Sequence, residues 1–319
     1  MNKKANILIT CGAGFIGSNI VDYLVRSGHQ GKIRVFDNLS SGNLANIEEH
    51  LTENCIEFLY GDMKNLEDCR KAIQGMDLIC HQAAVGSVPR SIADPLLSHS
   101  NNVNGFFNIL IAAKEQNIKR IVYASSSSVY GDHPVLPKKE ENTGNLLSPY
   151  AATKAIKETY ANVFTRCYNM ECIGLRYFNV FGPKQNPNGI YSAVIPRFIK
   201  QIRNGVSPEI YGDGSYSRDF TYVDNAVSAN ILALTTTNSK CFGEVYNIGA
   251  GGRTTILNLV NTIKEHLSSN IEIKIISNRA GDIPHSNADV SKALRDLNYK
   301  PLINFSQGIQ KLCEMSFIS

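Results

Sequence analysis

The segment ILITCGAGFIGSNIVDYL, near the start of the chain, constrains the fold more than any other feature of the sequence. Gly12, Gly14 and Gly17 follow the apolar run Ile7–Thr10, which has the length of a buried strand, and they open a helical pattern. Glycines at such a turn let backbone N–H groups approach a pyrophosphate, with the positive end of the helix behind it. A GxGxxG pattern alone also occurs in tight packing turns, but the strand–turn–helix context favours a dinucleotide-binding fold.

Asp37 stands at the end of the second predicted strand, twenty residues after the last of these glycines. A carboxylate there bonds both ribose hydroxyls and repels a 2′-phosphate, so the sequence favours NAD over NADP. The following loop, Asn38–Gly42, lacks the arginine that an NADP site needs. Asp62 follows the third predicted strand and Ala83–Ala84 the fourth, where they suit contacts to adenine and ribose.

Short apolar runs alternate with helical patterns over the first half of the chain, which indicates a parallel sheet covered by helices. The predicted strands are Ile7–Thr10, Ile33–Phe36, Ile56–Tyr60, Leu78–Cys80, Ile121–Ser125 and Cys172–Leu175, and the main helices are Phe15–Ser27, Leu96–Asn117 and Pro149–Tyr168. After Tyr177 we expect helices over Ala193–Asn204 and Asp224–Leu234 and a strand over Val245–Ile248. From about Thr254 we expect a helix, the strand Ile271–Ile276 and two terminal helices.

The predicted fold class is therefore α/β, a Rossmann-type doubly wound parallel sheet with a smaller mixed α/β C-terminal substrate lobe. We assign residues 1–177, together with about 220–250, to the NAD-binding domain. Residues 178–219 and 251–319 form the discontinuous lobe in this prediction.

Tyr150 and Lys154 lie four residues apart in SPYAATK, downstream of a run of four serines, Ser125 to Ser128. In a helix, positions i and i+4 share one face, so the phenol and the ammonium point into one cleft. A nearby cation pulls the pKa of a tyrosine down from about 10, which suits a general base that takes a proton from a hydroxyl. An ordinary surface lysine on an amphipathic helix explains the pair equally well until the glycine turn is considered.

The composition argues against several classes of function. The net charge is only +4 with no run rich in lysine or arginine, so nucleic-acid binding has little support. No apolar stretch approaches the roughly 20 residues that cross a bilayer, and the N-terminus has no signal-peptide pattern. The eight cysteines form no CxxC pair and the seven histidines no HExxH-like pair. We expect a cytoplasmic enzyme with free thiols, no membrane partner and no metal site.

Taken together, these motifs give the chain a family resemblance. The sequence resembles extended short-chain dehydrogenases/reductases and, within them, nucleotide-sugar 4-epimerases of the UDP-N-acetylglucosamine type, which are UDP-glucose 4-epimerase-like. The resemblance covers nearly the whole length and is carried by CGAGFIGS, DNLSSG, HQAAVGSVPRSI, ASSSSVYGD, SPYAATK, LRYFNVFGP, PNGIYSAVIPRF, YGDGSYSRDFTYVDN and AGDIPHSNADVSKA. One position departs from the family, which usually has Thr-Gly where this chain has Thr10-Cys11. If that position needs positive φ, the side chain costs of order 1 kcal/mol and weakens NAD binding.

The resemblance implies a mechanism. Tyr150 takes the proton of the sugar 4-hydroxyl while hydride passes from carbon 4 to the nicotinamide, and Lys154 holds the nicotinamide ribose. Ser126 bonds the reacting oxygen, and Ser127 contacts the sugar or relays a proton. Because an epimerase returns the hydride to the opposite face, the sugar must rotate while its diphosphate stays anchored.

The resemblance also implies two sets of binding residues. For the cofactor they are Gly12, Gly14, Phe15, Ile16, Asp37, Asn38, Ser40, Gly42, Asp62, Met63, Gln82, Ala83, Ala84, Asn101, Tyr150, Lys154, Tyr177 and Val180. For the UDP-sugar they are Gly86, Ser87, Ser126, Ser127, Tyr150, Asn179, Ala193, Val194, Tyr211, Arg218, Arg279, Asp282 and Ser286, with Arg218 and Arg279 as the diphosphate anchors. Glucose-restricted members carry a bulky aromatic where this chain has Ser286, so the serine leaves room for a 2-acetamido group.

These residues favour interconversion of UDP-GlcNAc and UDP-GalNAc and leave other activities open. A UDP-glucose/UDP-galactose 4-epimerase and a UDP-uronic acid 4-epimerase remain, and Arg90 suits a substrate carboxylate. A 4,6-dehydratase needs an Asp-Glu pair where this chain has Ser127 and Ser128. A decarboxylase needs a glutamate in the same stretch, which this chain also lacks. An NAD-sensing protein without catalysis would not need Ser126, Tyr150 and Lys154, so their presence argues against it.

The resemblance also implies a homodimer through Leu96–Asn117 and Pro149–Tyr168, and surface-polysaccharide synthesis as the family's usual setting.

Overall fold

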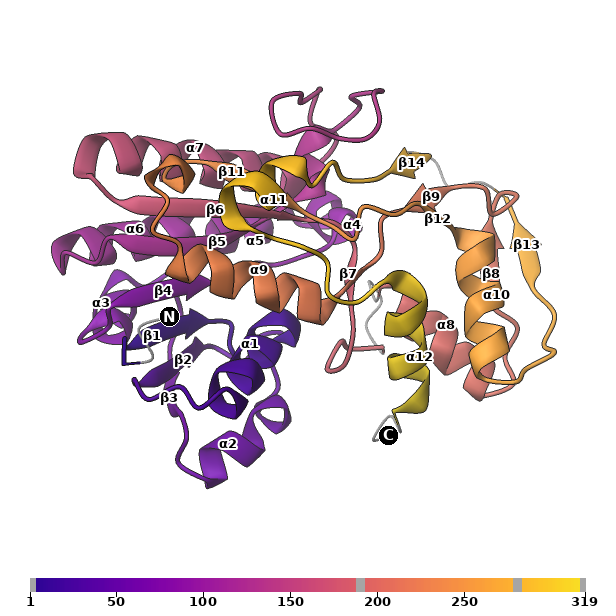
Figure 1. The fold of residues 1–319 in the computed structure, drawn as a ribbon, viewed down its shortest axis with the longest axis horizontal. Coiled ribbons are helices and arrows are strands. Elements are labelled where there is room, and N and C mark those ends of the chain that lie inside the picture. Colours follow the sequence, from indigo (N-terminus) through magenta and orange to yellow (C-terminus); the bar gives the residue numbers. More distant parts are fainter. Residues whose placement is uncertain (1–3, 188–192, 278–282, 316–319) are drawn as a thin grey trace.

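The computed structural model describes residues 4–187, 193–277 and 283–315. Its centre is a seven-stranded parallel sheet in the order β11-β6-β5-β4-β1-β2-β3 (Figure 1). The strands are β1 (Ile7–Thr10), β2 (Ile33–Asp37), β3 (Glu57–Tyr60), β4 (Leu78–His81), β5 (Arg120–Ser126), β6 (Glu171–Tyr177) and β11 (Val245–Ile248). The strand order reverses between β1 and β4, which confirms the doubly wound fold predicted from the sequence.

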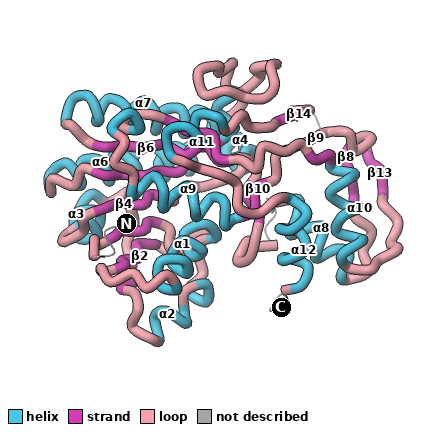
Figure 2. Tube along the Cα trace, in the orientation of Figure 1, coloured by secondary structure: helices cyan, strands magenta, loops and turns pink. Residues whose placement is uncertain are grey.

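Helices cover both faces of this sheet (Figure 2). On one face α1 (Phe15–Arg26) packs against α9 (Val223–Thr235), and on the other α3 (Leu66–Ile73), α6 (Gly105–Glu115) and α7 (Pro149–Tyr168) lie side by side. Ile7 and Ile9 of β1 belong to the first hydrophobic cluster and Leu8 to the second, as the period of two along a strand requires. Because both faces are covered, every residue of β1 and β2 is buried.

The remaining elements form the smaller lobe and the surface of the larger one. The lobe contains α8 (Val194–Arg203), α10 (Ile256–His266) and α12 (Phe305–Glu314), with α10 packed against the other two, and a parallel pair of β8 (Glu209–Tyr211) with β13 (Lys274–Ile276). β9 (Ser217–Arg218) lies between β12 (Thr254–Thr255) and β14 (His285–Ser286), and β7 (Val180–Phe181) pairs with β10 (Thr221–Tyr222). The other helices are α2 (Glu48–Thr52), α4 (Val88–Ala93), α5 (Pro95–His99) and α11 (Ser291–Leu297).

Two predicted elements differ from the structure. The helix expected over Leu96–Asn117 is divided into α5, a π-helical turn over Ser100–Asn104, and α6, which ends at Glu115. The strand expected over Ile271–Ile276 is shorter, because only Lys274–Ile276 pair with β8. Within the described residues, no helix is both long and apolar enough to cross a membrane.

Candidate cofactor and active site

A cleft opens at the carboxyl ends of β1, β2, β3 and β4. This is the edge where doubly wound folds bind their ligands, beside the point at which the strand order reverses. Seven of the predicted cofactor residues line it, together with others that the sequence did not suggest. The lining residues are Thr10, Cys11, Phe36, Asp37, Asn38, Ser40, Ser41, Gly61, Met63, Ala83, Ala84, Val85 and Asn101.

The glycine turn between β1 and α1 is as tight as the sequence predicts. A Cβ on Gly17 would lie 2.2 Å from the carbonyl oxygen of Cys11, and one on Gly12 would lie 2.8 Å from the Val35 side chain. Gly14 is the N-cap of α1 and provides no side-chain cap, and Phe15 and Ile16 form the first turn. The positive end of α1 therefore stands beside the cleft, where an anionic pyrophosphate is stabilised.

Asp37 is buried at the base of this cleft. Its carboxylate accepts hydrogen bonds from the backbone N–H groups of Ala13, at 3.1 Å, and Leu39, at 2.9 Å. Burial raises the pKa of Asp37, and these two bonds oppose the shift. A Cβ on Gly42 would lie 2.8 Å from Asp37 Oδ2, so the loop after β2 closes tightly over the carboxylate. The Asp62 carboxylate accepts a hydrogen bond from Asn38 Nδ2 at 3.3 Å.

Cys11 has a φ of 54°, so its position does need the left-handed backbone conformation. The thiol is hydrogen-bonded to the side chains of Asp37 and Ser41. Burial, and then the Asp37 carboxylate, raise the pKa of Cys11 to about 12, which keeps the thiol protonated.

Tyr150, Lys154 and Ser126 come together at the start of α7. Ser148 caps the helix by accepting from Ala151 N–H at 3.1 Å, which places Tyr150 in the first turn. Ser126 ends β5, and its side chain is hydrogen-bonded to the Tyr150 hydroxyl.

Lys154 Nζ lies 5.6 Å from the centre of the Tyr150 ring and donates to the carbonyl of Ala124 at 2.9 Å. Ser127 follows Ser126 in a 3-10 turn over Ser127–Tyr130.

The expectation that Lys154 lowers the pKa of Tyr150 is wrong for this structure. Burial raises the pKa of Tyr150, opposed by the Ser126 hydrogen bond, whereas a fall caused by Lys154 was expected. Burial also lowers the pKa of Lys154 to about 8, and Glu158 opposes that shift. Desolvation therefore outweighs the attraction between phenolate and ammonium, because the buried site penalises both charged forms.

Two predicted cofactor residues bond to each other below the cleft. Tyr177 donates to Gln82 Oε1 at 3.0 Å and accepts from Asn230 Nδ2 at 2.7 Å. Val180 lies in β7, next to Asn179, which has a φ of 29° and donates to the Asp219 carbonyl at 3.4 Å.

On the substrate side, β9 and β14 place Arg218 directly beside Ser286. Arg218 donates to the carbonyls of Ser217, at 2.9 Å, and Pro284, at 3.1 Å. Gly86 has open space where a Cβ would stand, and Ser87 has a φ of 89°, a strained value for a serine.

The other predicted substrate residues are more dispersed. Ala193 is the N-cap of α8, and Val194 begins that helix. Tyr211 is exposed at the end of β8. The predicted anchor Arg279 and the predicted substrate residue Asp282 lie outside the described residues.

Sequence reasoning missed several buried polar residues near the site. Asp219, adjacent to Arg218, accepts from the N–H groups of Ala250, Gly251 and Ala288 at 2.9–3.2 Å, and burial raises its pKa to about 6. Its place in the SRDF motif was the only available signal.

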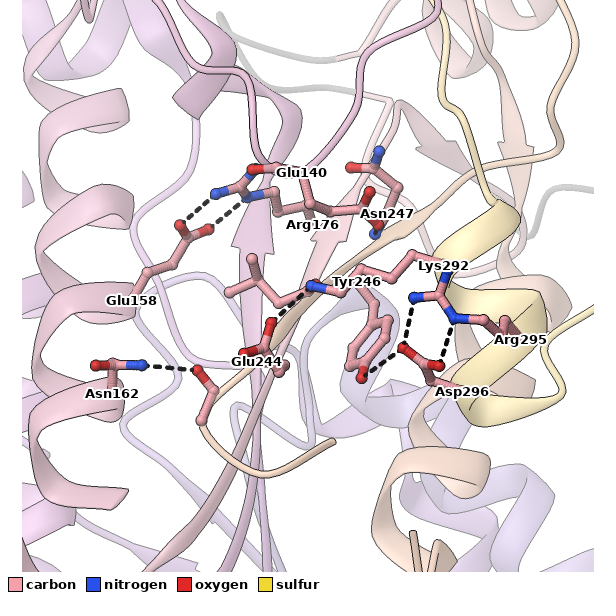
Figure 3. Close-up of polar contacts among 12 residues, drawn as sticks. Glu140, Glu158, Asn162, Arg176, Glu244, Tyr246, Asn247, Lys292, Arg295 and Asp296 are labelled. Carbon is pink, nitrogen blue, oxygen red and sulfur yellow. Dashed lines mark hydrogen bonds and ion pairs between the residues drawn. The ribbon is translucent and has the colours of Figure 1, made fainter. Parts of the chain in front are cut away.

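On α7, Glu158 pairs with Arg176 of β6 (Figure 3). No group of three His, Cys, Asp or Glu side chains in the described part of the chain could hold a metal ion.

The chain belongs to the NAD dependent epimerase/dehydratase family, whose model matches residues 7–249. NAD is the cofactor, and the residues of the cleft fit it: a buried carboxylate at the end of β2, a glycine turn and an uncapped helix N-terminus. This confirms the prediction of an NAD-dependent nucleotide-sugar epimerase with the extended short-chain dehydrogenase/reductase fold.

Known proteins similar to this chain differ in the sugars that they are named for. A putative UDP-glucose 4-epimerase of Methanocaldococcus jannaschii is 36% identical over 96% of both chains. The structure of a UDP-N-acetylglucosamine 4-epimerase from Methanobrevibacter ruminantium, in complex with UDP-N-acetylmuramic acid, is 41% identical, with a TM-score of 0.91 over 98% of this chain and 97% of that one. A UDP-glucuronic acid 4-epimerase from Bacillus cereus, in complex with UDP-glucuronic acid and NAD, is 29% identical, with a TM-score of 0.89 over 97% of this chain and 98% of that one.

Proposed function

We propose that this enzyme interconverts UDP-N-acetylglucosamine and UDP-N-acetylgalactosamine through a 4-keto sugar. The observation that carries the proposal is the cluster of Tyr150, Ser126 and Lys154 beside the cofactor cleft. The space at Gly86 and the small side chain of Ser286 beside Arg218 suit an acetamido group. The similarity to a UDP-N-acetylglucosamine 4-epimerase supports the same substrate.

In this mechanism the chain's own residues move one proton and hold the sugar. Bound NAD supplies the acceptor, and later the donor, of a hydride. The Tyr150 oxygen takes the proton of the sugar 4-hydroxyl, while the Ser126 hydroxyl holds the same oxygen. To accept this proton Tyr150 must be a phenolate, and the Lys154 ammonium close to its ring favours that charged form. Arg218 holds the diphosphate while the sugar turns, and Tyr150 then returns the proton.

A UDP-uronic acid 4-epimerase is the second candidate, with UDP-glucose as a further alternative. Arg90 lies in α4, three residues after Ser87, whose hydroxyl accepts from the Arg90 N–H at 3.3 Å. A guanidinium close to the sugar pocket suits a substrate carboxylate. One similar structure carries UDP-N-acetylmuramic acid and another UDP-glucuronic acid, both of which have such a group.

We also propose that the enzyme is a cytoplasmic homodimer. All eight cysteines are free thiols, which fits a reducing compartment. Ile92, Leu96 and Val163 are exposed apolar side chains on α4, α5 and α7, three helices that pack together, and we assign these helices to the contact between the two copies.

The experiment is a panel of UDP-GlcNAc, UDP-Glc and UDP-GlcA, with products separated after incubation with the purified enzyme. We expect the acetamido sugar to react fastest, with no net reduction of NAD, since the hydride returns to the same sugar. Tyr150→Phe should lower the rate by about two orders of magnitude, as expected for loss of a general base. Tyr160→Phe, on the same helix but partly exposed, is the matched control and should retain the rate.

Ser286→Tyr tests the substrate preference separately from the chemistry. The larger side chain should slow UDP-GlcNAc much more than UDP-Glc, because it fills the space assigned to the acetamido group. Equal loss on both sugars would argue against this pocket, and a fastest reaction with UDP-GlcA would favour the second candidate.

A further inference from the structure

The loop Ala83–Val85 follows β4 and lines the cofactor cleft. A loop in this position must hold its shape, because its backbone sets the wall against which a ligand packs. Side chains hold the backbone N–H and carbonyl groups of both Ala83 and Val85, and both sets of contacts lead to α7.

A closed ring of hydrogen bonds holds Ala83. Lys157 Nζ donates to the Ala83 carbonyl at 3.0 Å and contacts His81 Nε2 at 3.1 Å. His81 Nδ1 lies 3.0 Å from Thr10 Oγ1, which accepts from the Ala83 N–H at 3.2 Å. Lys157 and His81 are fully buried and Thr10 is 1% exposed, so water does not compete for these bonds.

Asn102 holds Val85 in the same way. Its Oδ1 accepts from the Val85 N–H at 2.7 Å, and its Nδ2 donates to the Val85 carbonyl at 3.1 Å. Asn102 Nδ2 also donates to Thr153 Oγ1 at 3.0 Å, and Thr153 directly precedes Lys154 on α7. The helix α7, which carries the catalytic pair, therefore holds the loop on both sides of Ala84: directly through Lys157, and through Asn102 by way of Thr153.

The burial of Lys157 is costly, and packing alone does not explain it. Burial, and then the neighbouring Lys154, lower the pKa of Lys157 well below its usual value, and burial likewise lowers that of His81. The Lys157 nitrogen meets a carbonyl and an imidazole rather than a carboxylate. A methionine, which is of similar length, would fill this space without the desolvation cost.

We propose that Lys157 is a positioning residue that fixes Ala83–Ala84 against bound NAD and couples this wall of the cleft to the helix of Tyr150 and Lys154. The inference rests on the proposed placement of the cofactor in the cleft. Lys157 contacts neither substrate nor reacting atoms, and it acts through the loop alone.

The test is the affinity for NAD of Lys157→Met, measured by the NAD-dependent rise in melting temperature and by the NAD retained after gel filtration. We expect affinity to fall about tenfold, because the Ala83 carbonyl loses its donor and the loop relaxes. Lys138→Met is the matched control: this lysine is 3% exposed and donates to the His133 carbonyl, away from the cleft. It should bind NAD like the wild type even where its melting temperature without ligand falls.

Thr10→Val is a milder second variant, since it removes the acceptor of the Ala83 N–H and keeps the side-chain volume. It should weaken NAD several-fold and leave the melting-temperature rise with UDP alone unchanged, whereas general loosening would weaken both ligands. Wild-type NAD affinity in both Lys157→Met and Thr10→Val would overturn the inference. If the wild type itself shows no response to NAD, the proposed placement of the cofactor fails instead.

Discussion

At the scale of single residues, Cys11 occupies a backbone conformation that glycine adopts at little cost. Its φ of 54° brings Cβ close to the following carbonyl oxygen, which costs a residue other than glycine roughly 1–2 kcal/mol. The thiol recovers part of this through its contacts with Asp37 and Ser41. The strain therefore sits in the turn that approaches the cofactor.

Replacing Cys11 by glycine should stabilise the protein. We expect Cys11→Gly to raise the free energy of unfolding by about 1 kcal/mol, because relief of the strain outweighs the lost thiol contacts. Urea denaturation measures the change. Cys11→Ala keeps the strained Cβ and loses the thiol, so it should be no more stable than the wild type, and a more stable alanine variant would refute the strain argument.

At the scale of elements, α7 joins the catalytic residues to the sheet by a buried ion pair. Arg176 of β6 donates from Nε and Nη2 to the two carboxylate oxygens of Glu158, at 2.9 and 2.8 Å (Figure 3). Arg176 also donates to the Tyr130 hydroxyl and to the Glu140 carbonyl, both at 3.0 Å. One turn before Glu158 on the same helix is Lys154, whose charged form Glu158 favours.

Glu158→Gln should destabilise the protein strongly. The variant leaves the Arg176 charge buried beside a neutral amide, and breaking such a pair costs about 3 kcal/mol of unfolding free energy. Glu115→Gln on α6 breaks the exposed pair with Arg70 of α3 and should change stability little, so it is the matched control. Equal shifts of the urea midpoint in both variants would show that burial of the Glu158 pair does not matter.

At the scale of the whole molecule, periodicity predicted the sheet and its helices because apolar runs such as Ile7–Thr10 are buried on both faces. It did not predict the π-helical turn at Ser100–Asn104, because the helical pattern continues through it. The glycine turn and Asp37 were recognisable from local spacing alone.

Features that depend on burial could not be predicted from the sequence. Lysines are usually exposed, so Lys157 gave no signal of its contact with Ala83. The rise in the pKa of Tyr150 was missed for the same reason, since desolvation depends on what packs around the ring.

The proposed dimer makes the last prediction. Leu96 on α5 is 76% exposed, and α4 and α7, which pack against α5, carry further exposed apolar side chains. Burying such a surface against a second copy is favourable at about 25 cal/mol per Å², and a lysine at its centre would place a charge in the interface. Leu96→Lys should therefore lower the mass measured by light scattering from twice 35.1 kDa to the monomer value.

Leu302→Lys is the control. It alters a leucine that is 63% exposed and follows α11, so it should leave the dimer intact. A wild-type protein that already scatters as a monomer would show that this apolar surface has another role.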